Sequence, residues 1–354
     1  MEGMTFRVLQ WATGNIGTRS LREVIRDPEL ELVGLVTYDP AKHGVDAGDL
    51  CGEGTTGVLA TTDRVAARGL AADCVVYMPR IVDVDDVLAM VEAGTNVVST
   101  CVEFFDHGRM LPAEDRARLA DACARSGASI FATGSSPGFI SETLPYALLL
   151  LQRRVDSFFI EEYANMSRRD SPHMIFEQIG FGKPMPDAPD APKPRRIDTV
   201  PHLAAIADAA GITIDEWIST SEVAAARQHT KVLAGELDAG TVGAVRRIIA
   251  GRRDGEDAVR ITYCWYLTPE LDPQWDVGPT GWRVRVRGDA PLDVDLPFPI
   301  PLDDLADFTP AYTANPAVNA IPYVCAARPG FLTAHDLPPM TLAGTRTRDG
   351  GSAP

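Results

Sequence analysis

The chain has 354 residues, and 33 Lys and Arg against 49 Asp and Glu give it a formal net charge of −16 at pH 7. A hydrophobic fraction of 45% and a charged fraction of 23% exclude wholesale disorder, and the length suggests two domains. The acidity excludes a surface built for nucleic acid or for an anionic membrane, because charges of the same sign repel.

The cysteines and histidines, six of each, are scattered along the chain with no Cys-x-x-Cys pair and no Cys/His cluster. This spacing predicts neither a disulfide framework nor a metal centre, and unpaired cysteines fit a reducing compartment. The first residues do not show a secretory pattern, and the longest apolar run, Tyr146–Leu151, is too short to cross a bilayer. We therefore expect a cytoplasmic protein with neither a membrane nor a nucleic-acid partner.

Strands and helices alternate through the first part of the chain. Apolar strand-like runs lie at residues 6–12, 30–38, 74–78, 96–100 and 129–133. Helical patterns between them lie at 18–26, 82–93 and 112–126. Apolar strands separated by helices predict an α/β fold, a Rossmann-type doubly wound parallel sheet, over residues 1–137.

The rhythm changes after Arg154. Long strands with few helices between them predict a second, α+β domain with a mixed or antiparallel sheet, at 138–304, to bind substrate. Its expected elements are strands at 156–165, 258–266 and 281–287, a Pro-rich loop at 183–196 and a helix at 199–210. Residues 305–342, with a helix at 315–327, are expected to return to the first domain, and the tail 343–354 to be disordered.

The strongest motif is the turn after the first strand, Ala12-Thr13-Gly14-Asn15-Ile16-Gly17. A turn of this kind brings backbone N–H groups at a helix N-terminus against a pyrophosphate. Gly14 leaves room for the phosphates and Gly17 lets the helix pack on the strand, although Ala12 replaces the usual first glycine. The turn predicts NAD(P) binding, and an ordinary glycine-rich turn is the alternative.

An acid follows the second predicted strand. Asp39 lies 22 residues beyond Gly17, where a carboxylate can accept hydrogen bonds from both ribose hydroxyls of NAD and would repel the 2′-phosphate of NADP. Lys42 and His43 follow closely and could bind that phosphate instead. Asp39 could also simply begin a turn before Pro40, so the choice between NAD and NADP stays open.

Three segments should converge at the carboxyl ends of the parallel strands, where ligands bind in such sheets. Met78 and Pro79 follow one strand, and the loop around Ser136 and Pro137 offers groups to the nicotinamide. Glu103 follows another strand among apolar neighbours, a setting that suits a carboxylate for proton transfer. A helix-capping or ion-paired glutamate is the alternative.

Four segments resemble the native amine dehydrogenase and 2,4-diaminopentanoate dehydrogenase family, whose members have a dihydrodipicolinate reductase-like N-terminal domain. They are WATGNIGTRSLREVI, NVVSTCVEF, TGSSPGF and NPAVNAIPYVCAARPGFLTAHDLP, and the chain looks most like the actinobacterial members. The resemblance implies an NAD(P)-dependent oxidoreductase acting on CH–NH2 groups, usually a homodimer, so that the second domain would also dimerise. The family's catalytic glutamate falls on Glu103, and Ser136 stands where relatives carry asparagine.

The resemblance to the actinobacterial members implies reversible reductive amination of small ketones or aldehydes with ammonia by hydride transfer. Candidate residues of the substrate pocket are Phe139, Tyr163, Asn165 and Phe176. The enzymatic alternative is a diamino or amino acid dehydrogenase of the 2,4-diaminopentanoate type, with Arg80 or Arg168 binding the substrate carboxylate. A non-catalytic NAD(P)-binding sensor is the alternative from another class.

Overall fold

A computed structural model describes residues 5–186, 193–194 and 201–341. The tail predicted at 343–354 and much of the Pro-rich loop predicted at 183–196 lie outside the described residues. Two compact units divide the chain: residues up to Phe139 and from Pro310 onward form the first, and Ile140–Thr309 form the second.

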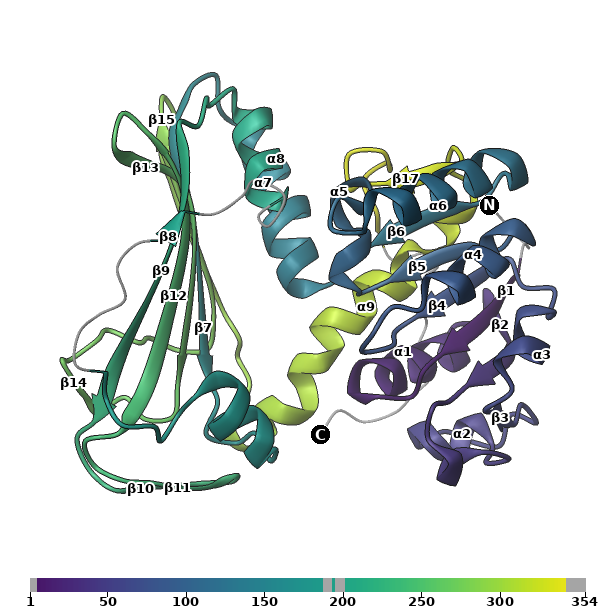
Figure 1. Ribbon diagram of the computed structural model, residues 1–354, viewed down its shortest axis with the longest axis horizontal. Helices are drawn as coiled ribbons and strands as arrows, with labels where there is room; N and C mark the ends of the chain where they lie inside the picture. Colours follow the sequence, from purple (N-terminus) through teal and green to yellow (C-terminus); the bar gives the residue numbers. More distant parts are fainter. Residues whose placement is uncertain (1–4, 187–192, 195–200, 342–354) are drawn as a thin grey trace. The chain divides into compact units, whose positions relative to one another are not determined.

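The first unit contains a parallel sheet of seven strands (Figure 1), as predicted. Their order is β17-β6-β5-β4-β1-β2-β3, and each neighbouring pair is parallel. From the central β1 the chain builds one half of the sheet through β2 and β3 and the other half from β4 onward, as in a doubly wound fold. The strands are β1 (Phe6–Trp11), β2 (Leu30–Val36), β3 (Ala60–Thr61), β4 (Cys74–Tyr77), β5 (Asn96–Ser99), β6 (Ser129–Ala132) and β17 (Gly330–Leu332).

Helices cover both faces of this sheet, which explains why its strands are apolar without alternation. On β4, Val75 and Tyr77 belong to one core cluster, while Cys74 and Val76 belong to another on the opposite face. The first cluster includes residues of α4 (Val84–Glu92) and α6 (Ala113–Ser126), and the second includes residues of α1 (Asn15–Arg26) and α9 (Leu305–Cys325). Shorter helices are α2 (Ala47–Cys51), α3 (Arg64–Arg68) and α5 (Phe105–Gly108).

Two helices begin earlier than the sequence pattern predicts. Helix α1 begins at Asn15 rather than at residue 18, because Gly14 is its N-cap and the last three residues of the glycine turn already belong to the helix. Helix α9 begins at Leu305 rather than at residue 315 and contains Pro310, Pro316 and Pro322. The part before residue 315 was not predicted; Pro310, a residue type that normally marks a helix end, lies within it.

The second unit contains a mixed sheet, which confirms one of the two predicted forms. Its order is β14-β9-β12-β13-β7-β15-β16, with β8 (Lys193–Pro194) beside β9. Only β13 and β7 run parallel among its described strand pairs. The strands are β7 (Val155–Asn165), β9 (Glu216–Ala226), β12 (Val242–Arg253), β13 (Glu256–Tyr266), β14 (Leu271–Asp272), β15 (Gly281–Gly288) and β16 (Leu292–Pro297), and a separate hairpin is formed by β10 (Thr230–Val232) and β11 (Gly235–Leu237).

The two faces of this mixed sheet differ. Alternate residues such as Phe158 and Ile160 of β7 pack in the same apolar cluster as residues of α7 (Leu144–Leu149) and α8 (Pro201–Ala210), the helices beside the sheet in Figure 1. The residues between them, Phe159, Glu161 and Tyr163, lie on the other face, where arginines cover aromatic rings. Within the described ranges, no helix is long and apolar enough to cross a membrane.

Candidate functional site: the carboxyl edge of the parallel sheet

The glycine turn after β1 has the geometry that a pyrophosphate requires. A Cβ on Gly17 would lie 2.3 Å from the carbonyl oxygen of Ala12, so that only glycine allows this close approach of helix and strand. Above Gly14 no atom lies within 4 Å of the Cβ position, and no side chain caps the first N–H groups of α1. The helix N-terminus therefore faces open space with donors available for an anion.

Ala12, which replaces the usual first glycine of the turn, has a strained backbone conformation. Its φ is 80°, in the left-handed region that glycine adopts freely, and the residue is buried. An alanine in this conformation stores on the order of 1–2 kcal/mol of strain. The turn thus keeps the backbone path of a glycine-rich loop even where the side chain opposes it.

The residues after β2 bring a lysine, rather than a free carboxylate, to this turn. Asp39 caps the one-turn helix Pro40–Lys42, since its Oδ1 accepts a hydrogen bond from the backbone N–H of Ala41 at 3.0 Å. Lys42 reaches back, and its Nζ donates to the carbonyl oxygen of Thr13 at 2.9 Å. The turn-initiating alternative for Asp39 is therefore realised in the structure.

A cavity of about 680 Å³ lies beside this segment, within the first unit. Tyr38, 49% exposed, lines it together with Arg64 and the loop after β4, which includes Pro79, Arg80 and Ile81. The ring of Tyr38 and the aliphatic side chain of Ile81, 78% exposed, are apolar surfaces of the kind that planar heteroaromatic bases bind. The cavity suits the adenine end of a dinucleotide.

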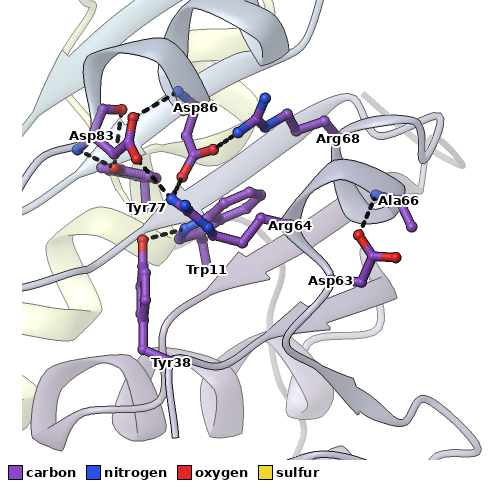
Figure 2. A network of polar contacts seen from close by, with 9 residues as sticks. All are labelled: Trp11, Tyr38, Asp63, Arg64, Ala66, Arg68, Tyr77, Asp83 and Asp86. Atoms are coloured by element: carbon purple, nitrogen blue, oxygen red, sulfur yellow. Dashed lines mark hydrogen bonds and ion pairs between the residues drawn. The ribbon is translucent and has the colours of Figure 1, made fainter. Parts of the chain in front are cut away.

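An ionic network around one buried carboxylate (Figure 2) contributes Arg64 and Asp83 to the lining of this cavity. The carboxylate of Asp86 is fully buried and pairs with both Arg64 and Arg68. Arg64 also donates to Asp83 at 2.7 Å, and this hydrogen bond holds the pKa of Asp83 below its usual value of 3.8. Asp83 in turn caps α4 by accepting from the backbone N–H of Asp86 at 3.2 Å. The network fixes α3 to α4.

Aromatic residues extend the network to the end of β2. The indole of Trp11 donates to the Tyr38 hydroxyl at 2.9 Å, while the guanidinium of Arg64 lies over the Tyr38 ring, 5.8 Å from its centroid. The Tyr77 hydroxyl accepts from the backbone N–H of Asp83 at 2.9 Å. Sequence reasoning missed this group, although Arg64 and Arg68 share one helix face and the acids sit at a helix start.

Hydrogen bonds join the ends of β4 and β5, which carry three of the predicted residues. Ser99 donates to the carbonyl oxygen of Tyr77 at 2.6 Å, and Thr100 donates to the sulfur of Met78 at 3.1 Å. The thiol of Cys101 donates to the carbonyl oxygen of Pro79 at 3.4 Å. The structure thus brings Met78 and Pro79 to the same sheet edge as the segment that bears Glu103.

Glu103 lies in a single turn, Val102–Phe104, directly after β5. Its side chain is half-buried, and its carboxylate makes no hydrogen bond or ion pair with any described residue. The neighbouring Phe104 and Phe105 are buried in the core. Neither the capping nor the ion-paired alternative therefore accounts for this glutamate.

The backbone just beyond Glu103 is strained. Asp106 and His107 have φ values of 47° and 58°, and Gly108 follows at 71°. Two consecutive non-glycine residues in this region cost on the order of 1–3 kcal/mol each. Asp106 is held by an ion pair with Arg109 at 2.8 Å. Strain of this kind clusters at functional sites, and here it defines how the chain turns away from Glu103.

The loop after β6 holds a polar group without a partner. The hydroxyl of Ser136 is buried and makes no hydrogen bond with the described residues, whereas Ser135 pairs with Thr313 at 2.7 Å. Gly138 has a φ of 125°, and a Cβ there would lie 3.1 Å from the carbonyl carbon of Thr133, so that the loop requires glycine. A buried hydroxyl left unpaired fits a loop that binds the carboxamide of a nicotinamide.

The candidate pocket residues of the second unit are largely engaged within that unit. The Tyr163 hydroxyl donates to Glu161 at 3.2 Å, and Arg283 lies 4.4 Å from its ring centroid. Asn165 Oδ1 accepts from the backbone N–H and the hydroxyl of Ser167. Phe176 packs in the apolar cluster around Ile175, Phe181 and Leu237, while Phe139, on the first unit, is 37% exposed.

The arginines considered as carboxylate ligands differ in their partners. Arg168 is neutralised by Asp303 at 2.6 Å, and Arg80 lines the cavity beside Tyr38. The neighbouring Arg169, which sequence reasoning did not select, donates to the Thr309 hydroxyl at 2.8 Å and pairs with no carboxylate among the described residues. Burial lowers the pKa of Arg169, and the negative charge of the neighbouring Asp170 offsets this only in part.

The strand order and the glycine turn define a Rossmann-type dinucleotide-binding protein, and comparison with known proteins narrows this class. A profile of the 2,4-diaminopentanoate dehydrogenase C-terminal domain matches residues 199–349. An amine dehydrogenase of Streptomyces virginiae is 32% identical over 344 residues, which span 93% of this chain and 95% of that protein. The chain therefore belongs to the amine dehydrogenase and 2,4-diaminopentanoate dehydrogenase family.

Solved structures support the same fold. The structure of an amine dehydrogenase from Mycobacterium smegmatis matches with a TM-score of 0.70 at 19% identity, covering 95% of this chain and 97% of that one. A probable dehydrogenase from Thermotoga maritima matches with a TM-score of 0.53 at 12% identity, covering 93% and 92%. Family membership confirms the predicted class, an NAD(P)-dependent oxidoreductase acting on CH–NH2 groups.

Proposed function

We propose that the protein catalyses reversible reductive amination, in which a small ketone or aldehyde, ammonia, NAD(P)H and a proton give the amine, NAD(P)+ and water. The observation that carries this proposal is the unpaired carboxylate of Glu103 at the carboxyl edge of the parallel sheet. A carboxylate suits the reaction because the charge that develops on the substrate is positive. The bound nicotinamide supplies the hydride.

Glu103 has two tasks in this reaction. It accepts a proton from ammonium, so that neutral ammonia can attack the carbonyl carbon, and it stabilises the cationic iminium that forms when water leaves. Both tasks need a carboxylate that is not neutralised by a neighbouring cation, as Glu103 is found. The buried hydroxyl of Ser136 would hold the carboxamide of the nicotinamide, and the N-terminus of α1 the pyrophosphate.

A second candidate substrate class is a diamino or amino acid, as in 2,4-diaminopentanoate oxidation. The observation that favours it is Arg169, a half-buried guanidinium without a carboxylate partner in the described part of the chain. A substrate carboxylate could form the bidentate pair that Arg169 lacks. The non-catalytic sensor is disfavoured by family membership and by the free Glu103.

The test is ammonia-dependent consumption of reduced cofactor with a panel of neutral ketones and of keto acids. We expect turnover with small neutral ketones and a loss of about 10²–10⁴-fold in Glu103→Gln, with reduced-cofactor binding retained. Glu114→Gln, which alters an exposed glutamate of α6, is the matched control and should leave turnover unchanged. Full turnover in Glu103→Gln would refute the catalytic role.

Arg169→Met separates the two substrate classes. If keto acids are the substrates, this variant should lower their kcat/KM by about tenfold or more while turnover of neutral ketones is kept. Equal effects on both classes would rule out a carboxylate-binding role.

We further propose that the protein works as a homodimer in a reducing cytoplasm, and that the second unit supplies most of the substrate pocket and the dimer contact. All six cysteines are unpaired, five of them buried, which fits a reducing compartment. Light scattering coupled to size-exclusion chromatography tests the dimer directly. A mass of one chain, 38.1 kDa, at catalytic concentration would contradict it.

A further inference from the structure

The first carboxylate after β2 is that of Asp39, three residues beyond the end of the strand at Val36. The residue that directly follows the strand is Thr37, which is buried. Its hydroxyl lies 3.0 Å from the hydroxyl of Thr13 and accepts from the backbone N–H of Asp39 at 3.2 Å. The strand end is therefore neutral and internally satisfied.

Asp39 is committed to the local turn. Its Oδ1 accepts the N–H of Ala41 and caps the helical turn Pro40–Lys42, and its carboxylate forms no ion pair with Lys42 or another described cation. An Asp before Pro that caps its own turn has a structural reason to be present without a ligand. One carboxylate oxygen of Asp39 thus serves its own turn, so its position 22 residues after Gly17 does not by itself indicate ribose binding.

Lys42 contributes a cation to this edge. Its Nζ lies 2.9 Å from the carbonyl oxygen and 3.3 Å from the hydroxyl of Thr13, both neutral acceptors. No carboxylate pairs with it among the described residues, and its side chain is half-buried. An ammonium has three donors, so at least one remains available here for an anion.

Its location relative to the two cofactor-binding features identifies which anion. Thr13 belongs to the turn that receives the pyrophosphate, and Tyr38 lines the cavity suited to adenine. The adenosine ribose joins these two groups, and it must therefore pass over the strand end between Thr13 and Tyr38, where the Lys42 ammonium lies.

We propose that Lys42 binds the 2′-phosphate of NADP and makes the protein prefer NADPH over NADH. The proposal specifies the cofactor of the function proposed above. Charge-assisted hydrogen bonds from an ammonium to phosphate are stronger than neutral ones, and NAD has no group that would use this charge.

Direct titration of the full chain with NADPH and with NADH, followed by nicotinamide fluorescence, tests the proposal without requiring turnover. We expect NADPH to bind about tenfold more tightly or better, and Lys42→Met to weaken NADPH by at least about tenfold while NADH changes less than about twofold. Lys42→Arg should keep the preference. Lys231→Met, which removes an exposed lysine of the β10–β11 hairpin, is the control and should change neither affinity.

The variant Asp39→Asn tests the alternative that Asp39 binds the ribose of NAD. If Asp39 only caps its turn, the variant keeps NADH binding within about twofold and binds NADPH at least as tightly, since a negative charge near the phosphate is removed. Tenfold weaker NADH binding in this variant, a preference of the unaltered chain for NADH, or equal weakening of both cofactors by Lys42→Met would each overturn the proposal. Because binding is the readout, its failure is distinct from a failure of reductive amination.

Discussion

The two units treat their charged side chains differently. At the carboxyl edge of the parallel sheet, no described residue satisfies the hydroxyl of Ser136 or neutralises Glu103 and Lys42, and no described side chain caps the N-terminus of α1. On the polar face of the mixed sheet, charged groups are already paired, as in Arg285 with Asp295 at 2.7 Å and Arg283 over Tyr163. Unused bonding capacity therefore distinguishes the edge at which we propose that the cofactor binds from a sheet face whose charged groups are already paired.

The largest effect on stability is expected at the ionic network around Asp86 in the first unit. Unlike the groups at the carboxyl edge, its charged groups are paired with one another. Asp86→Ala would remove the buried carboxylate that Arg64 and Arg68 share, and we expect the free energy of unfolding to fall by about 2–4 kcal/mol, since the partly exposed arginines regain contact with water. Urea denaturation measures it. Asp85→Ala, which alters the exposed neighbour paired with Arg118, is the matched control and should cost about 1 kcal/mol or less.

A smaller effect is expected in the phosphate-binding turn. Gly17→Ala places a Cβ 2.3 Å from the Ala12 carbonyl oxygen and should lower the free energy of unfolding by about 1–3 kcal/mol through backbone displacement. Gly14→Ala is the informative partner, because nothing in the protein lies within 4 Å of the added methyl group. It should preserve stability but weaken NAD(P)H binding. If both variants behave alike in melting and in cofactor titration, the two glycines do not have the separate roles assigned here.

The smallest effect is expected on the polar face of the mixed sheet. Arg283→Met removes a cation 4.4 Å from the Tyr163 ring centroid and should cost about 0.5–1 kcal/mol of stability. Since Arg283 lowers the pKa of Tyr163, which burial raises to about 12, its loss should also move the phenol titration upward. Ultraviolet titration checks this. If Arg283→Met lowered the free energy of unfolding as much as Asp86→Ala does, the proposed difference between the charged groups of the two units would be wrong.

Much of the fold could be predicted because its signals are local. Buried parallel strands read as uninterrupted apolar runs, and β1, β2, β4, β5 and β6 all lie within the predicted segments. Helix α9 was only half predicted: Pro310 interrupts the pattern of the missed part, although Pro316 and Pro322 did not prevent prediction of the rest.

The residues of the candidate site also differ in whether local sequence signals could identify them. Glu103 and the glycine turn could be selected from their place after strands, whereas the partners of Asp86, 18 and 22 residues away on another helix, follow only from tertiary packing. The same holds for Lys42: its contact with Thr13, 29 residues away, depends on how β1 and β2 lie side by side. Sequence distance alone pointed to Asp39 and could not distinguish a ribose ligand from a turn cap.

The most direct test of the central claim separates binding from chemistry in Glu103→Gln. Cofactor affinity and the rate of hydride transfer would be measured in one preparation, with a small neutral ketone and saturating ammonia, by following the absorbance of the reduced nicotinamide. The unpaired carboxylate predicts that affinity stays within about twofold while the ammonia-dependent rate falls by at least about a hundredfold. An unchanged rate, or a rate that falls only because the cofactor no longer binds, would contradict it.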